Sequence, residues 1–407
     1  MKTYFTSERQ TMRDNQRILQ TCETLNSTHA NDSQFAIATV AMAEGSAYRR
    51  HGARMLVLPD GKRVGSISGG CLESDVVAHA VKAIRSGVPE FVLYDSQISN
   101  SDLILELGCK GAVGILIEPG NSPSVQSVLG LFSTALKERR SSAIATVFQS
   151  QHSSLRMSSY VTLHDNGNVE GDLADSPLSC EILADLNQVL KTGRACSKTY
   201  APDNNPRENE VNVLLEPIEP PIALTLCGAG QDALPLIEMA RALGWQTTVV
   251  DHRKALLTQE RFPGAKLLHC SYPDSSFDLR ISDARTAVVI MTHNYEQDKA
   301  ILAAILSSPV RYLGLVGPRE RGEKIQRELR ESEVHFDDQF LRKLYSPAGL
   351  DIGAEPSEGI ALAILSEIQA VFSEREGGFL RHRVGSIHLP VNPYSAISRH
   401  SVLGESE

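Results

Sequence analysis

The sequence lacks the features of a secreted or membrane-embedded protein. None of its apolar runs approaches the roughly 18 residues of a membrane-spanning helix. Residues 1–16 (MKTYFTSERQTMRDNQ) hold no apolar segment of the kind found in a secretory signal. The formal net charge of −9 argues against a protein that coats nucleic acid or anionic membrane. We therefore expect a cytoplasmic protein with no nucleic-acid and no membrane partner.

The cysteines also lack a pattern. There are seven, and they are scattered without any C-x-x-C pair. Such an odd, dispersed set indicates neither a disulfide framework nor a zinc ribbon, and it favours a reducing compartment. Each cysteine has to be judged alone, with a buried apolar role as the plain alternative. The seven are Cys22, Cys71, Cys109, Cys180, Cys196, Cys227 and Cys270.

At 407 residues, the chain is long enough for two or three domains. The pattern predicts an N-terminal α/β domain, a middle α/β segment, a Rossmann-like domain that begins at the Glu-Pro-Pro of residues 219–221, and a polar tail. The expected bounds are 1–120, 121–218, 219–375 and 376–407.

Short sequence segments recur at a spacing of about 100 residues. AIATV occurs at 36–40 and again at 143–147, and ILIEP at 115–119 is echoed by VLLEP at 213–217. We interpret the first two segments as copies related by duplication. The alternative is that two α/β units share common strand words by chance.

Residues 222–373 alternate strictly between strand and helix patterns. This alternation predicts a doubly wound parallel sheet with helices on both faces. The first strand leads into G-x-G-x-x-A, in which Gly228 permits the tight turn and Gly230 lets the backbone approach a pyrophosphate. Asp251 ends the second strand, where an acid binds a ribose hydroxyl. The motif predicts a dinucleotide site; the alternative is a scaffold whose glycines only make the turn.

Two further residues bear on this site. Arg253 follows Asp251 closely and favours a 2′-phosphate, so the choice between NAD and NADP stays open. His293 follows the strand at 287–291, on the rim where such sheets bind ligands. It is a candidate acid-base group or ligand, with a surface loop histidine as the equal alternative.

Two segments of the first copy have no counterpart in the second, and we regard them as candidate site segments. GSAYRRHGARM (45–55) brings together Arg49, Arg50 and Arg54, whose guanidinium groups suit a phosphate or a pterin edge. The plain alternative is three solvated arginines.

The second segment, SISGGCLE (66–73), places Cys71 in the expected first turn of a helix, where thiolate is favoured. Gly69 and Gly70 are expected to leave free backbone amides for an anion. Cys109 lies in another glycine-flanked loop. The alternative for this segment is a tight turn with a core cysteine.

Taken together, these motifs resemble the XdhC/CoxI family of xanthine dehydrogenase accessory proteins. The resemblance extends over most of residues 35–373 and rests on several motifs in one order. These are ATVAMAEGSAYRRHGARMLVLPDGKRVGSISGGCLESDV (38–76), LTLCGAGQDALPL (224–236), GWQTTVVDHR (244–253), VIMTHNYEQD (289–298) and SPAGLDIGAEPSEGIALAILSEI (346–368).

The resemblance implies a cytoplasmic chaperone for a molybdopterin-type molybdenum cofactor rather than an enzyme in its own right. Such a protein protects the cofactor, supports its sulfuration by a cysteine desulfurase, and inserts it into an apo-molybdoenzyme of the xanthine dehydrogenase type. Cys71 and Cys109 are then the expected contacts with molybdenum or its exchangeable sulfur. A homodimer is expected on general grounds.

The chain departs from the family pattern at four positions. Tyr48 and His51 stand where the family often has prolines, Ser68 where a third glycine is common, and Pro318 where Gly-Ser-Arg is more usual. The serine puts anion binding at the glycine loop in doubt. An NAD(P)-dependent oxidoreductase with His293 as proton donor, and an assembly scaffold without a ligand, remain the competing hypotheses.

Overall fold

The structure is a computed structural model of the chain. It describes residues 7–28, 34–44, 49–95, 111–201, 209–270, 283–305, 308–331 and 338–384. The chain divides between Pro220 and Pro221 into two compact units. Among the helices described, none combines the length and the apolar character that crossing a membrane requires.

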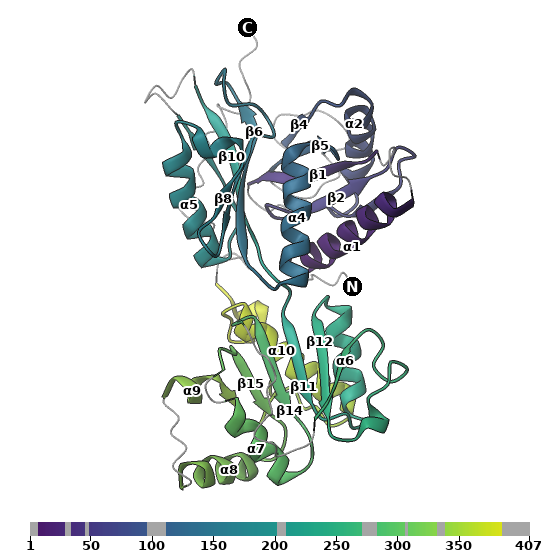
Figure 1. The fold of residues 1–407 in the computed structure, drawn as a ribbon, viewed down its shortest axis with the longest axis vertical. Helices are drawn as coiled ribbons and strands as arrows, with labels where there is room; N and C mark the ends of the chain where they lie inside the picture. The colour runs from purple at the N-terminus through teal and green to yellow at the C-terminus, as the bar shows by residue number, and fades with distance from the viewer. Residues whose placement is uncertain are drawn as a thin grey trace. The chain divides into compact units, whose positions relative to one another are not determined.

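The first unit contains two antiparallel sheets with helices against them (Figure 1). Its first half comprises α1 (Ser7–Thr28), β1 (Ala36–Ala43), β2 (Arg54–Val57), β3 (Arg63–Gly65), α2 (Glu73–Ser86), β4 (Glu90–Asp95) and β5 (Ala112–Pro119). Its second half comprises α4 (Pro123–Lys137), β6 (Ser142–Ser150), β7 (Tyr160–His164), β8 (Val169–Glu170), η1 (Asp172–Asp175), α5 (Ser179–Thr192), β9 (Cys196–Tyr200) and β10 (Val211–Ile218).

The two halves of the first unit have the same topology. The strand orders are β3-β2-β1-β5-β4 and β8-β7-β6-β10-β9. The registers correspond as well, because β1 pairs Ile37 with Glu118 on β5, and β6 pairs Ile144 with Glu216 on β10. Glu118 and Glu216 therefore occupy equivalent positions. This is the arrangement that an internal duplication produces, and we call the halves the first and second repeats.

The central strands of each sheet are buried on both faces, because β1, β5, β6 and β10 are buried along almost their whole length. Helix α2 packs on one face of the first sheet and α5 on one face of the second (Figure 1). The opposite faces share an apolar cluster in which the rings of Phe91 and Phe148 lie 5.0 Å apart. Helices α1 and α4 close this layer with a second group of apolar side chains. Residues of both repeats thus meet in one interior.

The second unit is a parallel sheet in the order β13-β12-β11-β14-β15-β16. Its elements are β11 (Ala223–Cys227), α6 (Ala233–Ala242), β12 (Gln246–Asp251), η2 (Lys254–Leu256), β13 (Lys266–His269), β14 (Thr286–Ile290), α7 (Tyr295–Ala304), β15 (Tyr312–Leu315), α8 (Arg319–Glu331), α9 (Asp338–Lys343), β16 (Leu344–Tyr345), α10 (Ser357–Phe372) and η3 (Leu380–His382). Separate apolar clusters lie on the two faces of the sheet.

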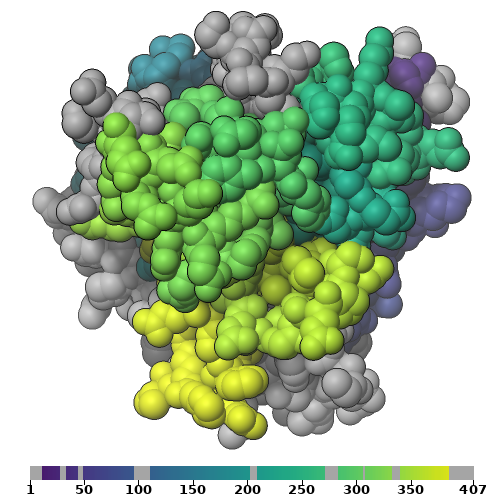
Figure 2. Space-filling view, turned by 90° about the horizontal axis from the view of Figure 1, so that it is seen from below, coloured from purple at the N-terminus to yellow at the C-terminus, as the bar shows by residue number. Residues whose placement is uncertain are grey.

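The predicted fold class is confirmed, because a mixed α/β unit with antiparallel sheets precedes a Rossmann-like parallel sheet. The strand β16 was not predicted, since two residues are too few to show a pattern. In the parallel sheet the carboxyl ends of all strands reach one edge, where ligands of such folds bind. Figure 2 shows the segments that follow β11 and β12 (teal-green) next to those that follow β14 and β15 (green).

Candidate functional site

The arginine-rich segment before β2 lies inside the first unit. Arg49 donates from Nη2 to Asp14 of α1 at 2.9 Å, and the two side chains are 1% and 8% exposed. Arg54 forms an ion pair with Glu216 of the second repeat and donates from Nη1 to the carbonyl of Gly52 at 3.0 Å. Both ion pairs are buried. These two arginines therefore connect parts of the fold.

His51 makes a further contact between the repeats. Its Nε2 lies 3.1 Å from the hydroxyl of Ser197 on β9. Burial, with a smaller contribution from Arg50, lowers the pKa of His51 to about 4, so the ring is neutral at pH 7. Gly52 has a φ of +80°, and a Cβ there would lie 2.6 Å from Oε2 of Glu216. Glycine is required because this backbone passes directly over the carboxylate.

Two of these contacts, Arg54 with Glu216 and His51 with Ser197, reach side chains of the second repeat, whereas Arg49 binds Asp14 of α1. Arg49 and Arg54, proposed from the sequence as cofactor ligands, already have buried carboxylate partners, while Arg50 is half-buried. Cofactor binding by the three arginines stays a prediction.

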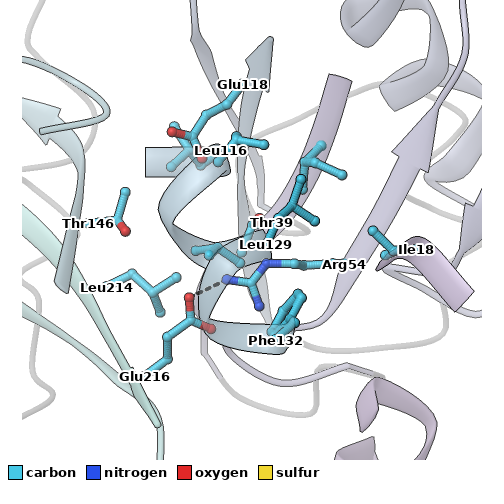
Figure 3. Close-up of a pocket in the computed structure, with 13 residues that line it drawn as sticks. Ile18, Thr39, Arg54, Leu116, Glu118, Leu129, Phe132, Thr146, Leu214 and Glu216 are labelled. Atoms are coloured by element: carbon cyan, nitrogen blue, oxygen red, sulfur yellow. Dashed lines mark hydrogen bonds and ion pairs between the residues drawn. The ribbon is translucent and has the colours of Figure 1, made fainter. Parts of the chain in front are cut away.

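A small pocket lies where the repeats meet (Figure 3). It pairs equivalent residues of the two copies, Thr39 with Thr146 and Glu118 with Glu216, around the single guanidinium of Arg54. The remaining lining side chains are apolar, namely Ile18, Ile37, Leu116, Val125, Val128, Leu129, Phe132 and Leu214.

The two carboxyl groups of the pocket differ in their surroundings. Glu216 has Arg54 as its partner, whereas Glu118 accepts a hydrogen bond from the Ser124 hydroxyl at 2.5 Å. Burial raises the pKa of Glu118, which outweighs the effects of Ser124 and of the more distant Arg54. The pocket therefore has one acid that is paired with a guanidinium and one acid that burial holds toward its neutral form.

The glycine loop before α2 is organised by Ser68. The serine hydroxyl accepts hydrogen bonds from the amides of Gly70 at 3.1 Å and Leu72 at 3.2 Å, and it donates to Glu73. Glu73 also accepts from the Ser68 amide at 3.0 Å. Burial raises the pKa of Glu73, but these hydrogen bonds outweigh it and hold the pKa below its usual range. The expectation of a free Gly70 amide is wrong, because the serine that replaces a family glycine occupies it.

The sequence predicts Cys71 in the first helical turn, and this prediction is wrong. Cys71 lies in the loop before the helix. Helix α2 begins at Glu73, with Leu72 at its N-cap. The Cys71 thiol is half-buried and lies 3.7 Å from the Ser68 hydroxyl, beside the exposed Gly69 and Gly70. The loop thus presents a thiol on a frame held by Ser68 and Glu73.

The predicted metal contacts are tested only in part. Cys109 lies outside the described residues. Within the part of the chain that is described, three or more His, Cys, Asp or Glu side chains never gather in a way that would hold a metal ion.

At the Rossmann turn, the carboxylate of Asp251, proposed for ribose binding, already accepts four hydrogen bonds from Ala229 and Arg253. Asp251 accepts from the amides of Ala229 and Arg253, each at 2.7 Å, and from the Arg253 guanidinium at 2.8 and 3.0 Å. The side chain is buried, which raises its pKa, but the bonds with Arg253 prevail and lower it to about 2. Gly228 has the left-handed φ of +125° that the predicted tight turn requires.

His293 has a partner that the sequence analysis did not identify. Its Nε2 lies 2.7 Å from Oδ2 of Asp232, the residue before α6. The imidazole is 64% exposed, and the φ of His293 is +59°, which is uncommon for a residue other than glycine. The hydrogen bond thus connects the glycine turn with the end of β14.

Other site residues were also missed, for different reasons. A sequence signal existed for two of them. Asp232 is an acid inside the glycine motif, and Glu216 corresponds to Glu118 in the repeated Glu-Pro segments. Asp14 and Ser197 carry no local signal, because only the folded first unit brings them to Arg49 and His51.

Comparison with known proteins gives matches in both units. The model of the XdhC Rossmann domain matches residues 224–368, and that of the XdhC and CoxI family matches residues 29–95. A Bacillus subtilis (strain 168) protein, which is named as a probable xanthine dehydrogenase subunit, is 29% identical to this chain over 345 residues. The match covers 83% of this chain and 93% of that protein.

Two further matches extend over most of the chain. The molybdenum cofactor insertion chaperone PaoD of Escherichia coli (strain K12) is 21% identical over 341 residues, which is 84% of each chain. A crystal structure described as a xanthine dehydrogenase from Bacillus halodurans is 27% identical with a TM-score of 0.66, covering 88% of this chain and 96% of that chain.

Proposed function

We propose that this chain, which belongs to the XdhC and CoxI family, is an accessory protein that binds the molybdenum cofactor and inserts it into a molybdoenzyme of the xanthine dehydrogenase type. Membership of the family, inferred from the sequence motifs, is confirmed by the two family models. The accessory role is supported by relatives that match over most of their length, one named as a cofactor insertion chaperone and the other as a xanthine dehydrogenase subunit.

One observation of the structure carries the proposal: the Cys71 thiol stands beside exposed glycines on a loop that side-chain hydrogen bonds hold together. Ser68 and Glu73 fix that loop through four hydrogen bonds, so the thiol is held in place without a metal. A soft sulfur ligand suits molybdenum and its exchangeable sulfur. The cofactor is cargo in this role, so binding has to be firm and reversible.

The site residues are assigned accordingly. Cys71 and Cys109 contact molybdenum or its sulfur, and the exposed surface at Gly69 and Gly70 receives the cofactor. The cofactor phosphate does not bind the Gly70 amide, which Ser68 already holds. Support of sulfuration requires a cysteine desulfurase as a second partner beside the apo-molybdoenzyme. We place these steps in the cytoplasm and expect a homodimer.

The test is anaerobic equilibrium binding of molybdopterin-type cofactor to the full chain, measured by molybdenum content and pterin fluorescence. We expect wild type to bind, and Cys71→Ala to bind at least about tenfold more weakly, because it removes a direct sulfur contact. Cys180→Ala is the matched control. Cys180 is an exposed thiol near the start of α5, the helix that corresponds to α2 in the second repeat.

Failure of the wild-type chain to bind or protect the cofactor would refute the proposal. Equal losses in Cys71→Ala and Cys180→Ala would remove Cys71 from the site. Insertion is tested separately, by activation of a purified apo-molybdoenzyme with loaded chain in the presence and absence of a cysteine desulfurase.

A further inference from the structure

The Rossmann unit raises a question that the cofactor role does not answer: does its glycine turn bind a dinucleotide? In folds of this kind, the pyrophosphate lies against the second glycine of the motif and the N-terminus of the following helix. The corresponding parts of this chain are Gly230 and the start of α6. The side chains around them give the answer.

The space over Gly230 is filled by an acid. A Cβ at residue 230 would lie 2.5 Å from Oδ1 of Asp232. The carboxylate of Asp232 therefore covers a face of the glycine that the motif leaves bare for a close approach of phosphate. A pyrophosphate in that place would have to displace this carboxylate and would meet its negative charge.

The same carboxylate stands at the positive end of α6, although it makes no hydrogen bond to the helix amides. Asp232 stands at the N-cap of α6, where the helix dipole favours negative charge. Its other oxygen, Oδ2, bonds to His293 at 2.7 Å. The positive end of the helix and the nearby imidazole thus already face an internal anion.

The turn itself is held in this arrangement. Arg261 donates from Nη2 to the carbonyls of Ala229 at 3.0 Å and Gly230 at 3.2 Å. The Ala229 amide is bound by Asp251, whose carboxylate is in turn occupied by Arg253. The acid that would bind a ribose hydroxyl is therefore also engaged.

We propose that Asp232 closes the glycine turn to dinucleotides, so that the Rossmann unit of this chain does not use NAD or NADP. The acid acts as an internal substitute for the pyrophosphate. The competing hypothesis of an NAD(P)-dependent oxidoreductase would need this site, and the residues present do not fit it. The inference concerns the second unit alone and does not depend on cofactor binding by the first.

The experiment measures binding of NADH, NADPH and inorganic pyrophosphate to the full chain by calorimetry. Wild type should bind none of them at millimolar concentration. Asp232→Ala removes both the charge and the covering side chain, and it should bind pyrophosphate with a dissociation constant at least roughly tenfold below the limit set by wild type. Asp232→Asn removes the charge alone and should give a smaller gain. Glu238→Gln, an exposed acid on the same helix, is the matched control and should behave as wild type.

Two results would overturn the proposal. One is micromolar binding of NADH or NADPH by wild type. The other is an Asp232→Ala chain that gains no affinity for pyrophosphate while the fluorescence of Trp245 shows its unit folded. If the alanine variant does not fold, the asparagine variant decides the question, because it keeps the size of the side chain. Cofactor binding by the same preparations shows independently whether the proposed function holds.

Discussion

Replacing Arg54 by methionine should destabilise the first unit by about 3–5 kcal/mol, the usual cost of removing one partner of a buried ion pair. Arg54 and Glu216 are each only 4% exposed, so water cannot replace the missing charge. The variant also loses the hydrogen bond to Gly52 and the contact of the guanidinium with the Phe132 ring, whose centroid lies 5.3 Å away. Methionine keeps the volume, so a cavity contributes little.

The second carboxyl group of the pocket makes the prediction more specific. In Glu216→Gln the charge of Arg54 loses its partner, but removing the charge of residue 216 also lowers the pKa of the nearby Glu118. The charge of Arg54 then acts on Glu118 alone, which partly replaces Glu216. We expect Glu216→Gln to cost less than Arg54→Met, and Glu216→Gln with Glu118→Gln to cost more than the sum of the two single changes.

The assay is urea unfolding at pH 7, followed by two probes. Far-UV circular dichroism reports both units, whereas the fluorescence of Trp245, the only tryptophan, reports the second. Arg54→Met should shift the dichroism transition and leave the Trp245 transition unchanged. A loss below about 1 kcal/mol, or additive costs for the two glutamate changes, would refute the account of the pocket.

Two further predictions concern acid. His51 is neutral in the fold and has a pKa near 4 against 6.5 when unfolded, so its contribution is present above pH 6.5 and is lost as the pH falls toward 4. The first unit should lose about 3 kcal/mol over this range, and His51→Gln should flatten the profile measured by urea unfolding. The pKa of Asp251 is about 2 against 3.8 unfolded, so its contribution is present above pH 3.8 and is lost as the pH falls through 2. Asp251→Asn should cost the second unit about 2 kcal/mol at pH 7 by Trp245 fluorescence, and a difference between the two chains that persists at pH 2 would contradict this assignment.

Local patterns were sufficient to predict most of the secondary structure and its grouping. The strand words at 36–40 and 143–147 form the equivalent strands β1 and β6. Gly87 and Gly193 end the equivalent helices α2 and α5 in the left-handed conformation. Such signals predict secondary structure because the spacing of apolar residues and the conformation of a helix end depend on residues that are close in the sequence.

Single residues within the motifs were harder to interpret. The serine at position 68 was recognised as a departure, but only the structure shows that its hydroxyl binds two amides of the loop. Asp232 belongs to the glycine motif, and its effect on the turn depends on a side-chain rotamer and on His293, 61 residues away.

The sequence by itself determined the repeated α/β architecture, the Rossmann sheet and the position of the glycine turn, because these follow from patterns within short segments. Only the tertiary structure decided what the charged residues do. Arg54 finds Glu216 162 residues away, and it does so because two sheets of like topology pack face to face. The partner of a buried charge depends on that packing, for which no local pattern exists.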